Sequence, residues 1–229
     1  MKDPVVPKYL QQLIDEREGL HLDFKFEISG FRKIARSLVA FANTDGGKLL
    51  IGVKDNGKIA GIRTDEELYM VQAAANMYCR PKVDFYFRPW QVEKKTVLEV
   101  TIPKSSKRPH YAHDEKDRWR AYIRVKDKNF VANKVQLRVW QSENQPERKP
   151  VNIRFERKED VLLKYLREHE YITFGKFCKI ARLPANIAED VLVDLILIGV
   201  LKIEYTDEGI ARYVLVDNPE AGGIFNGII

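Results

Sequence analysis

Residues 41–57 read Phe-Ala-Asn-Thr-Asp-Gly-Gly-Lys-Leu-Leu-Ile-Gly-Val-Lys-Asp-Asn-Gly, and three structural signals follow one another in them. An amphipathic helix ends at Asn43-Thr44, a Gly-Gly turn follows, and the apolar run 49–51 predicts a buried strand. Asn56-Gly57 predicts a hairpin turn after that strand. A helix, a tight turn and a strand joined in this way bring backbone N–H groups and polar side chains to one exposed edge.

The flanking sequence predicts a mixture of helices and hairpins. Residues 20–26 alternate apolar and polar side chains, which predicts a half-buried strand that displays His21, Asp23 and Lys25. The other predicted elements are helices over 7–17, 29–43, 64–79 and 133–140, and strands over 48–54, 58–62, 83–90, 96–102 and 121–126. We therefore expect an α+β fold, with a first domain over residues 1–140.

The remaining sequence predicts a second, smaller domain. Residues 141–153 are polar and contain two prolines, as expected for a linker. Residues 154–217 carry three helical patterns followed by two strands, which is typical of a winged helix. Residues 218–229 form an apolar tail that is either disordered or docks on a partner subunit.

Composition restricts the possible classes of protein. The 229 residues are 45% hydrophobic, as in ordinary globular domains, and no apolar run approaches the roughly 18 residues of a membrane span. The start of the sequence has no apolar signal-peptide region. Cys79 and Cys178 are too few for a tetrahedral zinc site, and we expect both to be reduced thiols. We expect a cytoplasmic protein without a membrane partner.

The net charge of +6 is unevenly distributed. Residues 104–138 contain eleven Lys and Arg against four Asp and Glu, a net charge of +7. Residues 155–217 contain nine Lys and Arg against twelve Asp and Glu, a net charge of −3. The positive potential therefore belongs to the first domain, where it would attract a polyanion.

Four motifs, in order within residues 12–135, resemble the Alba-type domain of the Schlafen family. They are residues 18–25 (Glu-Gly-Leu-His-Leu-Asp-Phe-Lys), 41–47 (Phe-Ala-Asn-Thr-Asp-Gly-Gly), 108–111 (Arg-Pro-His-Tyr) and 120–125 (Arg-Ala-Tyr-Ile-Arg-Val). Gly19 stands where the family usually has Ser, and Asp23 where it usually has Glu. The resemblance implies an Alba-like α/β domain. Members of the family bind nucleic acid, cleave RNA or have no assigned chemistry.

The resemblance also implies a catalytic and metal-binding role for three carboxylates, Glu18, Asp23 and Asp55, which match the acidic positions of nuclease-active Schlafen domains. Clustered carboxylates bind Mn²⁺ or Mg²⁺, and the metal can activate water against a phosphodiester. The alternative is that Asp55 serves the Asn-Gly turn while Asp23 pairs with a surface base such as Lys25.

Basic residues around one strand suggest a nucleic-acid-binding surface. Arg120, Tyr122, Arg124 and Lys126 lie at a period of two, which predicts three cations and an aromatic ring on one face. Arg and Lys would contact phosphates while Tyr stacks on bases. The full set that we select is Lys25, Arg108, His110, Arg118, Arg120, Tyr122, Arg124 and Lys126. The alternative is a solvated face neutralised by nearby acids.

Two other activities are disfavoured. The Gly46-Gly47-Lys48 segment follows a helix and precedes a strand, the reverse of a phosphate-binding loop, so we do not expect an ATPase. The third helix of the second domain would present Glu189, Asp190 and Asp194 to solvent, where carboxylates repel phosphate. This helix favours a protein contact over DNA reading.

We therefore expect a nucleic-acid-binding protein resembling a transcription regulator, which needs no cofactor for binding. The competing hypothesis is a Mn²⁺- or Mg²⁺-dependent endoribonuclease, and a third is an assembly module in which the basic patch is incidental. Schlafen proteins enclose a basic groove between two lobes of this type, but the sequence contains one copy of the Phe-Ala-Asn-Thr motif. We therefore also expect a homodimer.

Overall fold

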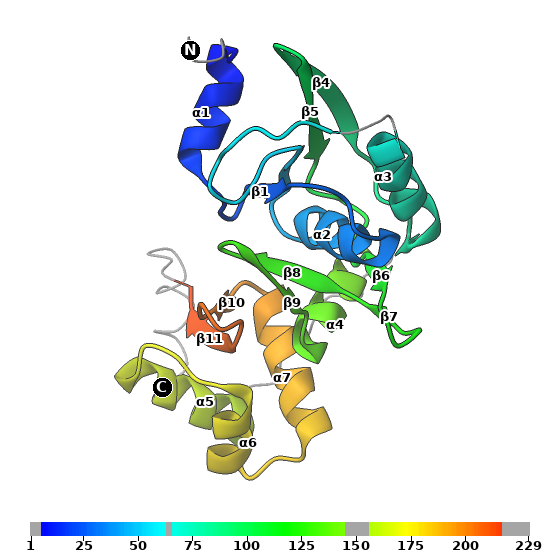
Figure 1. Ribbon diagram of the computed structural model, residues 1–229. Helices are drawn as coiled ribbons and strands as arrows, with labels where there is room; N and C mark the ends of the chain where they lie inside the picture. The colour runs from blue at the N-terminus through cyan, green and yellow to red at the C-terminus, as the bar shows by residue number, and fades with distance from the viewer. Residues whose placement is uncertain (1–5, 63–65, 145–155, 217–229) are drawn as a thin grey trace. The chain divides into compact units, whose positions relative to one another are not determined.

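The computed structural model describes residues 6–62, 66–144 and 156–216. The chain divides into two compact units, Met1–Ala132 and Asn133–Ile229, whose elements are labelled in Figure 1. The expected apolar tail, 218–229, and residues 145–153 of the expected linker lie outside the described residues. In the part of the chain that is described, no helix has the length and apolarity needed to cross a membrane.

A four-stranded sheet with the order β1-β2-β5-β4 forms the centre of the first unit. Its strands are β1 (Leu22–Lys25), β2 (Gly47–Ile51), β5 (Lys95–Ile102) and β4 (Tyr86–Val92). β1 and β2 are parallel, so a crossover must join them, and α2 (Phe31–Asn43) supplies it. β5 is antiparallel to both β2 and β4. This arrangement leaves β4 at an edge of the sheet.

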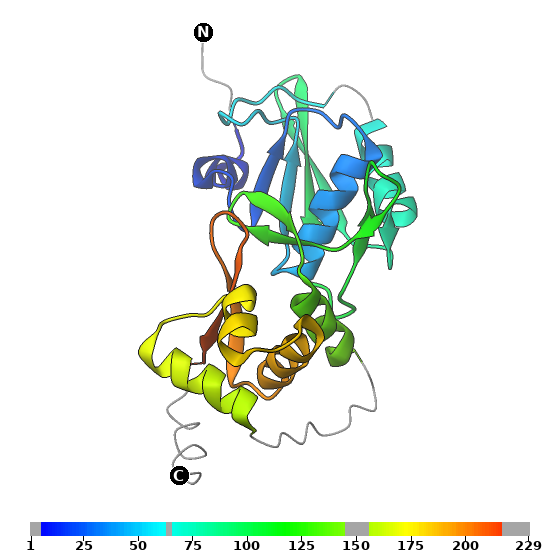
Figure 2. The same ribbon diagram turned by 90° about the horizontal axis from the view of Figure 1, so that it is seen from below.

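Helices cover the two faces of this sheet, as Figure 2 shows. Leu49 and Ile51 point to the face that packs against α2 and α3 (Glu66–Met77), whereas Leu50 points to the face that packs against α1 (Lys8–Glu16). This alternation follows from the two-residue period of a strand. The expected amphipathic helix over 29–43 is confirmed, with its apolar positions buried in the core.

Two smaller sheets complete the first unit. β3 (Cys79–Arg80), β6 (Tyr111–His113) and β7 (Trp119–Arg120) form one sheet, and β8 (Tyr122–Val125) pairs with β9 (Lys128–Val131) in the other. β8 packs on α2. The strand predicted over 121–126 is confirmed as β8, and the structure adds β9 as a hairpin partner that the sequence did not predict.

The hairpin expected over 48–54 and 58–62 is reduced to a single bridge between Val53 and Ile59. The reason is that both edges of β2 are already occupied, by β1 and by β5. Gly52 has a φ of +92° and lies so close to Gly61 that a Cβ atom would meet backbone at 2.8 Å. The chain therefore leaves the sheet at Gly52, and the Asn-Gly segment forms a turn outside it.

The second unit contains α4 (Lys134–Glu143), α5 (Arg157–Glu168), α6 (Phe174–Ala181), α7 (Ala185–Leu197) and the hairpin β10 (Leu201–Tyr205)–β11 (Ala211–Leu215). The expected order of three helices followed by a hairpin is confirmed, although assignment to the winged-helix class stays a prediction. The side chain of Thr173 caps α6, and Glu156 and Glu159 form a capping box on α5.

Helix α4, which we expected to close the first domain, packs on α7 in the second unit instead. Arg138 lies 2.6 Å from Asp190 and 4.0 Å from Glu189, and Lys134 lies 3.9 Å from Glu189. Glu189 and Asp190 of α7 are thus paired within their own unit, and Val193 of the same helix is buried. The acidic surface that favoured a protein contact is therefore smaller than the sequence suggested.

Candidate nucleic-acid interface

The Asn43-Thr44 motif holds three segments of the first unit together. The buried side chain of Asn43 donates to the carbonyl oxygens of His110 (2.9 Å) and Tyr122 (3.0 Å) and accepts from the N–H of His110 (2.8 Å). Thr44 Oγ1 donates to Ala40 and accepts from the N–H of Arg124 (2.9 Å). Because these partners lie 67 to 80 residues further along the chain, the motif fixes the loop before β6 and the strand β8 against the end of α2.

The Gly46-Gly47 pair is required by close packing. A Cβ atom on Gly47 would lie 2.4 Å from the ring of Phe41, and one on Gly46, where φ is +73°, would lie 2.8 Å from the carbonyl oxygen of Ile102. Such contacts leave no room for a side chain at either position. The two glycines of the most distinctive motif of the sequence are therefore explained by close packing within the fold.

His110 has a structural role and does not contact solvent. It is 3% exposed, Nδ1 lies 2.9 Å from the carbonyl oxygen of Pro81, and Nε2 lies 2.7 Å from Oγ of Ser105. Burial lowers the pKa of the His110 imidazole below its usual value. This position does not support the selection of His110 as a nucleic-acid-binding residue, because both ring nitrogens are used inside the unit.

Arg124 is also buried, at 3% exposure. Its guanidinium donates to the carbonyl oxygens of Gly19 (3.0 Å) and Leu22 (3.1 Å) and lies 3.4 Å from Asp23. It also lies over the ring of Phe41, 4.8 Å from the centroid. The period-two pattern correctly placed Tyr122 and Arg124 on one face of β8, but that face packs inward on α2, and Tyr122 is part of the core.

The three carboxylates implied by the resemblance do not converge in this structure. Glu18 and Asp23 interact: burial and the neighbouring Asp23 carboxylate raise the pKa of Glu18, whose Oε1 accepts the N–H of Phe24 at 2.8 Å. Asp55 lies in the exposed turn after β2. Among the described residues, no three His, Cys, Asp or Glu side chains are grouped so as to hold a metal ion.

The Asp23 carboxylate is already neutralised by bases. Its Oδ2 lies 2.7 Å from Nζ of Lys25, and its Oδ1 lies 3.4 Å from Arg124. A pair of carboxylates with two basic partners and no third acidic ligand fits a divalent metal poorly. We therefore derive no chemical step through a metal at this position.

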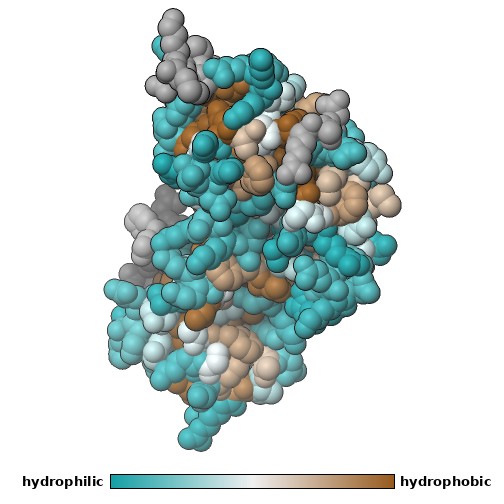
Figure 3. Space-filling model, in the orientation of Figure 1, coloured by the Kyte–Doolittle hydropathy of each residue, from teal (hydrophilic) through white to brown (hydrophobic). Residues whose placement is uncertain are grey.

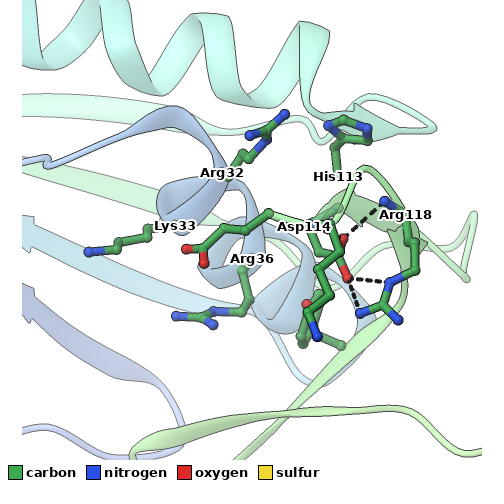
Figure 4. A pocket seen from close by; sticks show the side chains of 10 residues that line it. Arg32, Lys33, Arg36, His113, Asp114 and Arg118 are labelled. Carbon is green, nitrogen blue, oxygen red and sulfur yellow. Dashed lines mark hydrogen bonds and ion pairs between the residues drawn. The ribbon is translucent and has the colours of Figure 1, made fainter.

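Three cations of the first unit lie together on α2: Lys33 and Arg36 are exposed, and Arg32 is half-buried and pairs with Asp117 at 2.8 Å. Arg32, Lys33 and Arg36 line a pocket of about 160 Å³, facing His113, Asp114 and Arg118 from the segment around β6 and β7. Figure 4 shows the three α2 side chains and their neighbours, with Lys33 and Arg36 extending to the same side of the view. Arg36 is exposed and forms no ion pair with any residue that the structure describes.

A second pocket, of about 340 Å³, adjoins the same helix. Lys33 and Arg36 line it as well, together with Lys25 of β1 and Lys128 of β9. Asp23, Glu27 and Asp127 also line it, so its charge is mixed. Lys33 and Arg36 therefore line both pockets. We call Arg32, Lys33 and Arg36 the basic face of α2.

Asp114 organises the arginines beside this face. It accepts N–H groups of Lys116 and Arg118, and its Oδ2 accepts from the side chains of Arg118 (2.9 Å) and Arg120 (3.1 Å). Although desolvation opposes the shift, the hydrogen bonds from Arg118 and Lys116 hold the pKa of Asp114 well below its usual value. Arg118 and Arg120 thus stand in fixed positions with part of their charge compensated.

The remaining predicted nucleic-acid-binding residues lie outside the basic face of α2. Lys25 is half-buried and pairs with Asp23, Arg108 lies near the carbonyl oxygen of Asn43 at 3.5 Å, and Lys126 is exposed in the turn between β8 and β9. Figure 3 shows that hydrophilic side chains cover most of the region around β7–β9 in this view.

Sequence reasoning missed the basic face of α2, although its signal was present. Arg32, Lys33 and Arg36 occupy the side of the helix opposite Ile34, Ala35 and Leu38, and residues four apart share a helix face. The apolar positions of this helix indicated only its buried side, and the basic segment 104–138 does not include its cations. The polar side of the same helical pattern would have identified these cations.

Comparison with known proteins gives one family match. Residues 18–133, half of the chain, match the family described as Schlafen, AlbA_2. No curated protein matches the chain.

Two solved structures resemble part of the chain. The DIP2311 protein of Corynebacterium diphtheriae is 22% identical over 57% of this chain and 28% of its own length, with a TM-score of 0.40. The N-terminal domain of a putative ATP-dependent DNA helicase RecG-related protein from Nitrosomonas europaea is 23% identical over 46% of this chain and 81% of that domain, with a TM-score of 0.37. The chain thus spans less than a third of the Corynebacterium protein.

Proposed function

The chain belongs to the Schlafen AlbA_2 family, and we propose that its first unit binds nucleic acid through the basic face of α2. The observation that supports this most is the position of Lys33 and Arg36. Both are exposed on a helix whose other side is buried in the core, and both line two pockets that are bordered by charged side chains. Cations fixed on a rigid element and open to solvent are suited to phosphate contacts.

The geometry of the helix supports a track of phosphate contacts. Arg32 and Arg36 are one turn apart, a rise of about 6 Å along the axis. Lys25, Arg118, Arg120 and Lys126 would extend this track at its margins, each with a smaller contribution where its charge is already paired. Each neutralised phosphate releases counterions, so the affinity falls as salt rises.

Reversing two charges tests this proposal. The double variant Lys33→Glu/Arg36→Glu should bind labelled tRNA and labelled duplex DNA at least about tenfold more weakly than the wild type at low salt. Lys54→Glu/Lys58→Glu, a reversal of two exposed charges elsewhere in the same unit, is the matched control and should keep its affinity within about twofold. Equal weakening by the control would show that the loss of affinity comes from net charge alone. Unchanged binding by the Lys33→Glu/Arg36→Glu variant would refute the proposal.

Metal-dependent cleavage, which the family resemblance implies, is the second candidate function. The contact between Glu18 and Asp23 is the observation in its favour, and the two basic partners of Asp23 oppose it. Incubating tRNA with the protein in Mn²⁺ or in EDTA separates binding from cleavage. Glu18→Gln is the informative variant because the amide oxygen can still accept the N–H of Phe24. Manganese-dependent cleavage that Glu18→Gln abolishes, with binding retained, would establish this candidate. Intact tRNA under both conditions would leave binding as the function.

For the second unit we propose a winged-helix-like assembly role within a regulator-like protein. Its net charge is negative, and the acids on one side of α7 are paired with α4. Light scattering tests the expected homodimer directly. Deleting residues 222–229 should shift the protein from dimer to monomer, whereas a 26.6 kDa monomer for the full chain at micromolar concentration would refute the dimer.

A further inference from the structure

A different surface of the first unit carries ordered aromatic and basic side chains that the basic face of α2 does not include. Tyr86, Arg88 and Trp90 alternate along the edge strand β4 and therefore point to one face of the sheet. Trp90 packs in the cluster formed with α1, and its ring lies 5.4 Å from the ring of Tyr9. We call Tyr9, Tyr86, Arg88 and Trp90 the stacking face.

A buried carboxylate fixes the rings of this face. Glu99, 4% exposed, accepts from Trp90 Nε1 at 2.8 Å and from the Tyr9 hydroxyl at 3.1 Å. Lys48 lies 2.6 Å from the same carboxylate and neutralises it. The hydrogen bonds to Glu99 therefore fix the positions of the Trp90 indole and the Tyr9 phenol. Other side chains can pack on the faces of these rings.

Arg88 completes an ordered stack that faces solvent. Its guanidinium lies 4.0 Å from the centroid of the Trp90 ring. Glu99, its cross-strand neighbour, is taken up by Lys48, and Arg88 forms no ion pair within the described residues. Tyr86, two residues away on the same face, is 71% exposed. Residues two apart on a strand are about 7 Å apart, which is room for one planar base between the phenol and the guanidinium.

We propose that the stacking face binds unpaired nucleobases, so that the first unit prefers single-stranded to duplex nucleic acid. This inference rests on the proposed function, because the basic face of α2 would supply the phosphate attraction. The stacking face lies on the α1 side of the sheet and α2 lies on the other side, so a single strand that contacts both would pass around an edge of the sheet. Exposed aromatic rings and guanidinium planes stack on bases of any sequence when those bases are unpaired. In a duplex the bases are already stacked and paired, so contact with the stacking face would add little binding free energy.

The alternative occupant of an edge strand is a strand from another protein chain. Pro89, in the middle of β4, has no N–H to donate to such a strand. The exposed charge of Arg88 beside it also disfavours an apolar partner. Strand β4 is therefore better suited to binding a ligand through its side chains than to pairing with another strand through its backbone.

Two probes and one matched control test the inference. The probes are labelled oligothymidine of roughly 15 nucleotides and a labelled duplex of the same length. Tyr86→Ala and Arg88→Ala should each weaken oligothymidine binding about tenfold and change duplex binding less than about twofold. Phe87→Ala is the control, since Phe87 is also aromatic and 49% exposed but points to the opposite face of β4. It should leave both affinities unchanged.

The outcomes separate this inference from the proposed function. If the wild type binds both probes and Tyr86→Ala and Arg88→Ala do not affect oligothymidine binding, the stacking face is refuted while the basic face of α2 stands. If the wild type binds neither probe at low salt, both proposals fail. If the same variants change the mass measured by light scattering and not the affinity, the face joins protein chains and the inference is wrong. Tyr86→Phe, which keeps the ring, should retain binding.

Discussion

Arg36 on α2 and Arg124 on β8 belong to the same unit, on elements that pack against each other, yet their guanidinium groups have opposite surroundings. Arg36 is exposed and unpaired within the described residues, whereas Arg124 is buried and donates to two carbonyl oxygens and to Asn129. The first can exchange water for a phosphate, and the second already holds the protein together. A basic residue therefore indicates a binding surface only when the fold leaves its charge unsatisfied.

Removing Arg124 should have the largest effect on stability. Arg124→Ala leaves the buried Asp23 with half of its compensation and two carbonyl oxygens without a donor, so we expect a loss of about 4 kcal/mol in the free energy of unfolding. Urea denaturation followed by circular dichroism measures it. A loss below about 1 kcal/mol would show that Arg124 does not have the structural role described.

Removing the Asn43 side chain should have a somewhat smaller effect. Asn43→Ala breaks three buried hydrogen bonds and leaves the His110 N–H without its partner, which should cost about 3 kcal/mol. Proteolysis should then cut first in the segment before β6, because Asn43 anchors it. If cleavage begins elsewhere, the anchoring role is wrong even where the stability loss is confirmed.

In contrast to Arg124→Ala, the Arg36→Ala substitution should alter binding and leave stability almost unchanged. Because Arg36 is exposed, the unfolding free energy should change by less than about 0.5 kcal/mol. The slope of log affinity against log salt should become less steep by about 0.9, the contribution of one phosphate contact to duplex binding. Arg36→Lys should restore most of that slope. An unchanged slope would exclude Arg36 from the interface and weaken the contrast with Arg124.

The smallest expected effect concerns pH and His110. Burial lowers the pKa of this imidazole, so below the ordinary value of 6.5 the unfolded chain binds a proton that the folded protein does not. Stability should therefore be complete above pH 6.5 and fall as the pH is lowered beneath it. His110→Gln should remove this component, measured as the difference in urea midpoint between pH 7.5 and 5.5. Identical pH profiles for both proteins would contradict it.

Local sequence patterns predicted which segments form helices and strands. They did not predict which of these segments pair or pack with one another. The helix over 29–43 and the order of elements in the second unit followed from apolar spacing. The partners of β2 did not, because pairing with β1 and β5 depends on residues distant in the chain. A period of two likewise shows that Tyr122 and Arg124 share a face, but only the packing of α2 decides that this face is buried.

The candidate site was predicted only in part for the same reason. The basic character of the first unit was evident from composition, and Arg118 and Arg120 do lie beside the pocket or the Asp114 turn that borders it. His110 and Arg124 were selected by residue type, and their burial could not be known from type. The sequence could have identified Arg32, Lys33 and Arg36, because they lie on the polar side of a helix whose apolar side was already evident.

The Asn43 anchor has a consequence for the kinetics of binding. It ties the end of α2 to the segments on either side of it, so the helix that carries Lys33 and Arg36 is rigid before any ligand arrives. Binding would then restrict only the long basic side chains, at roughly 1 kcal/mol for each one that is immobilised. A preorganised surface of this kind docks as a rigid body, and its encounter rate is set by electrostatic steering rather than by a conformational step.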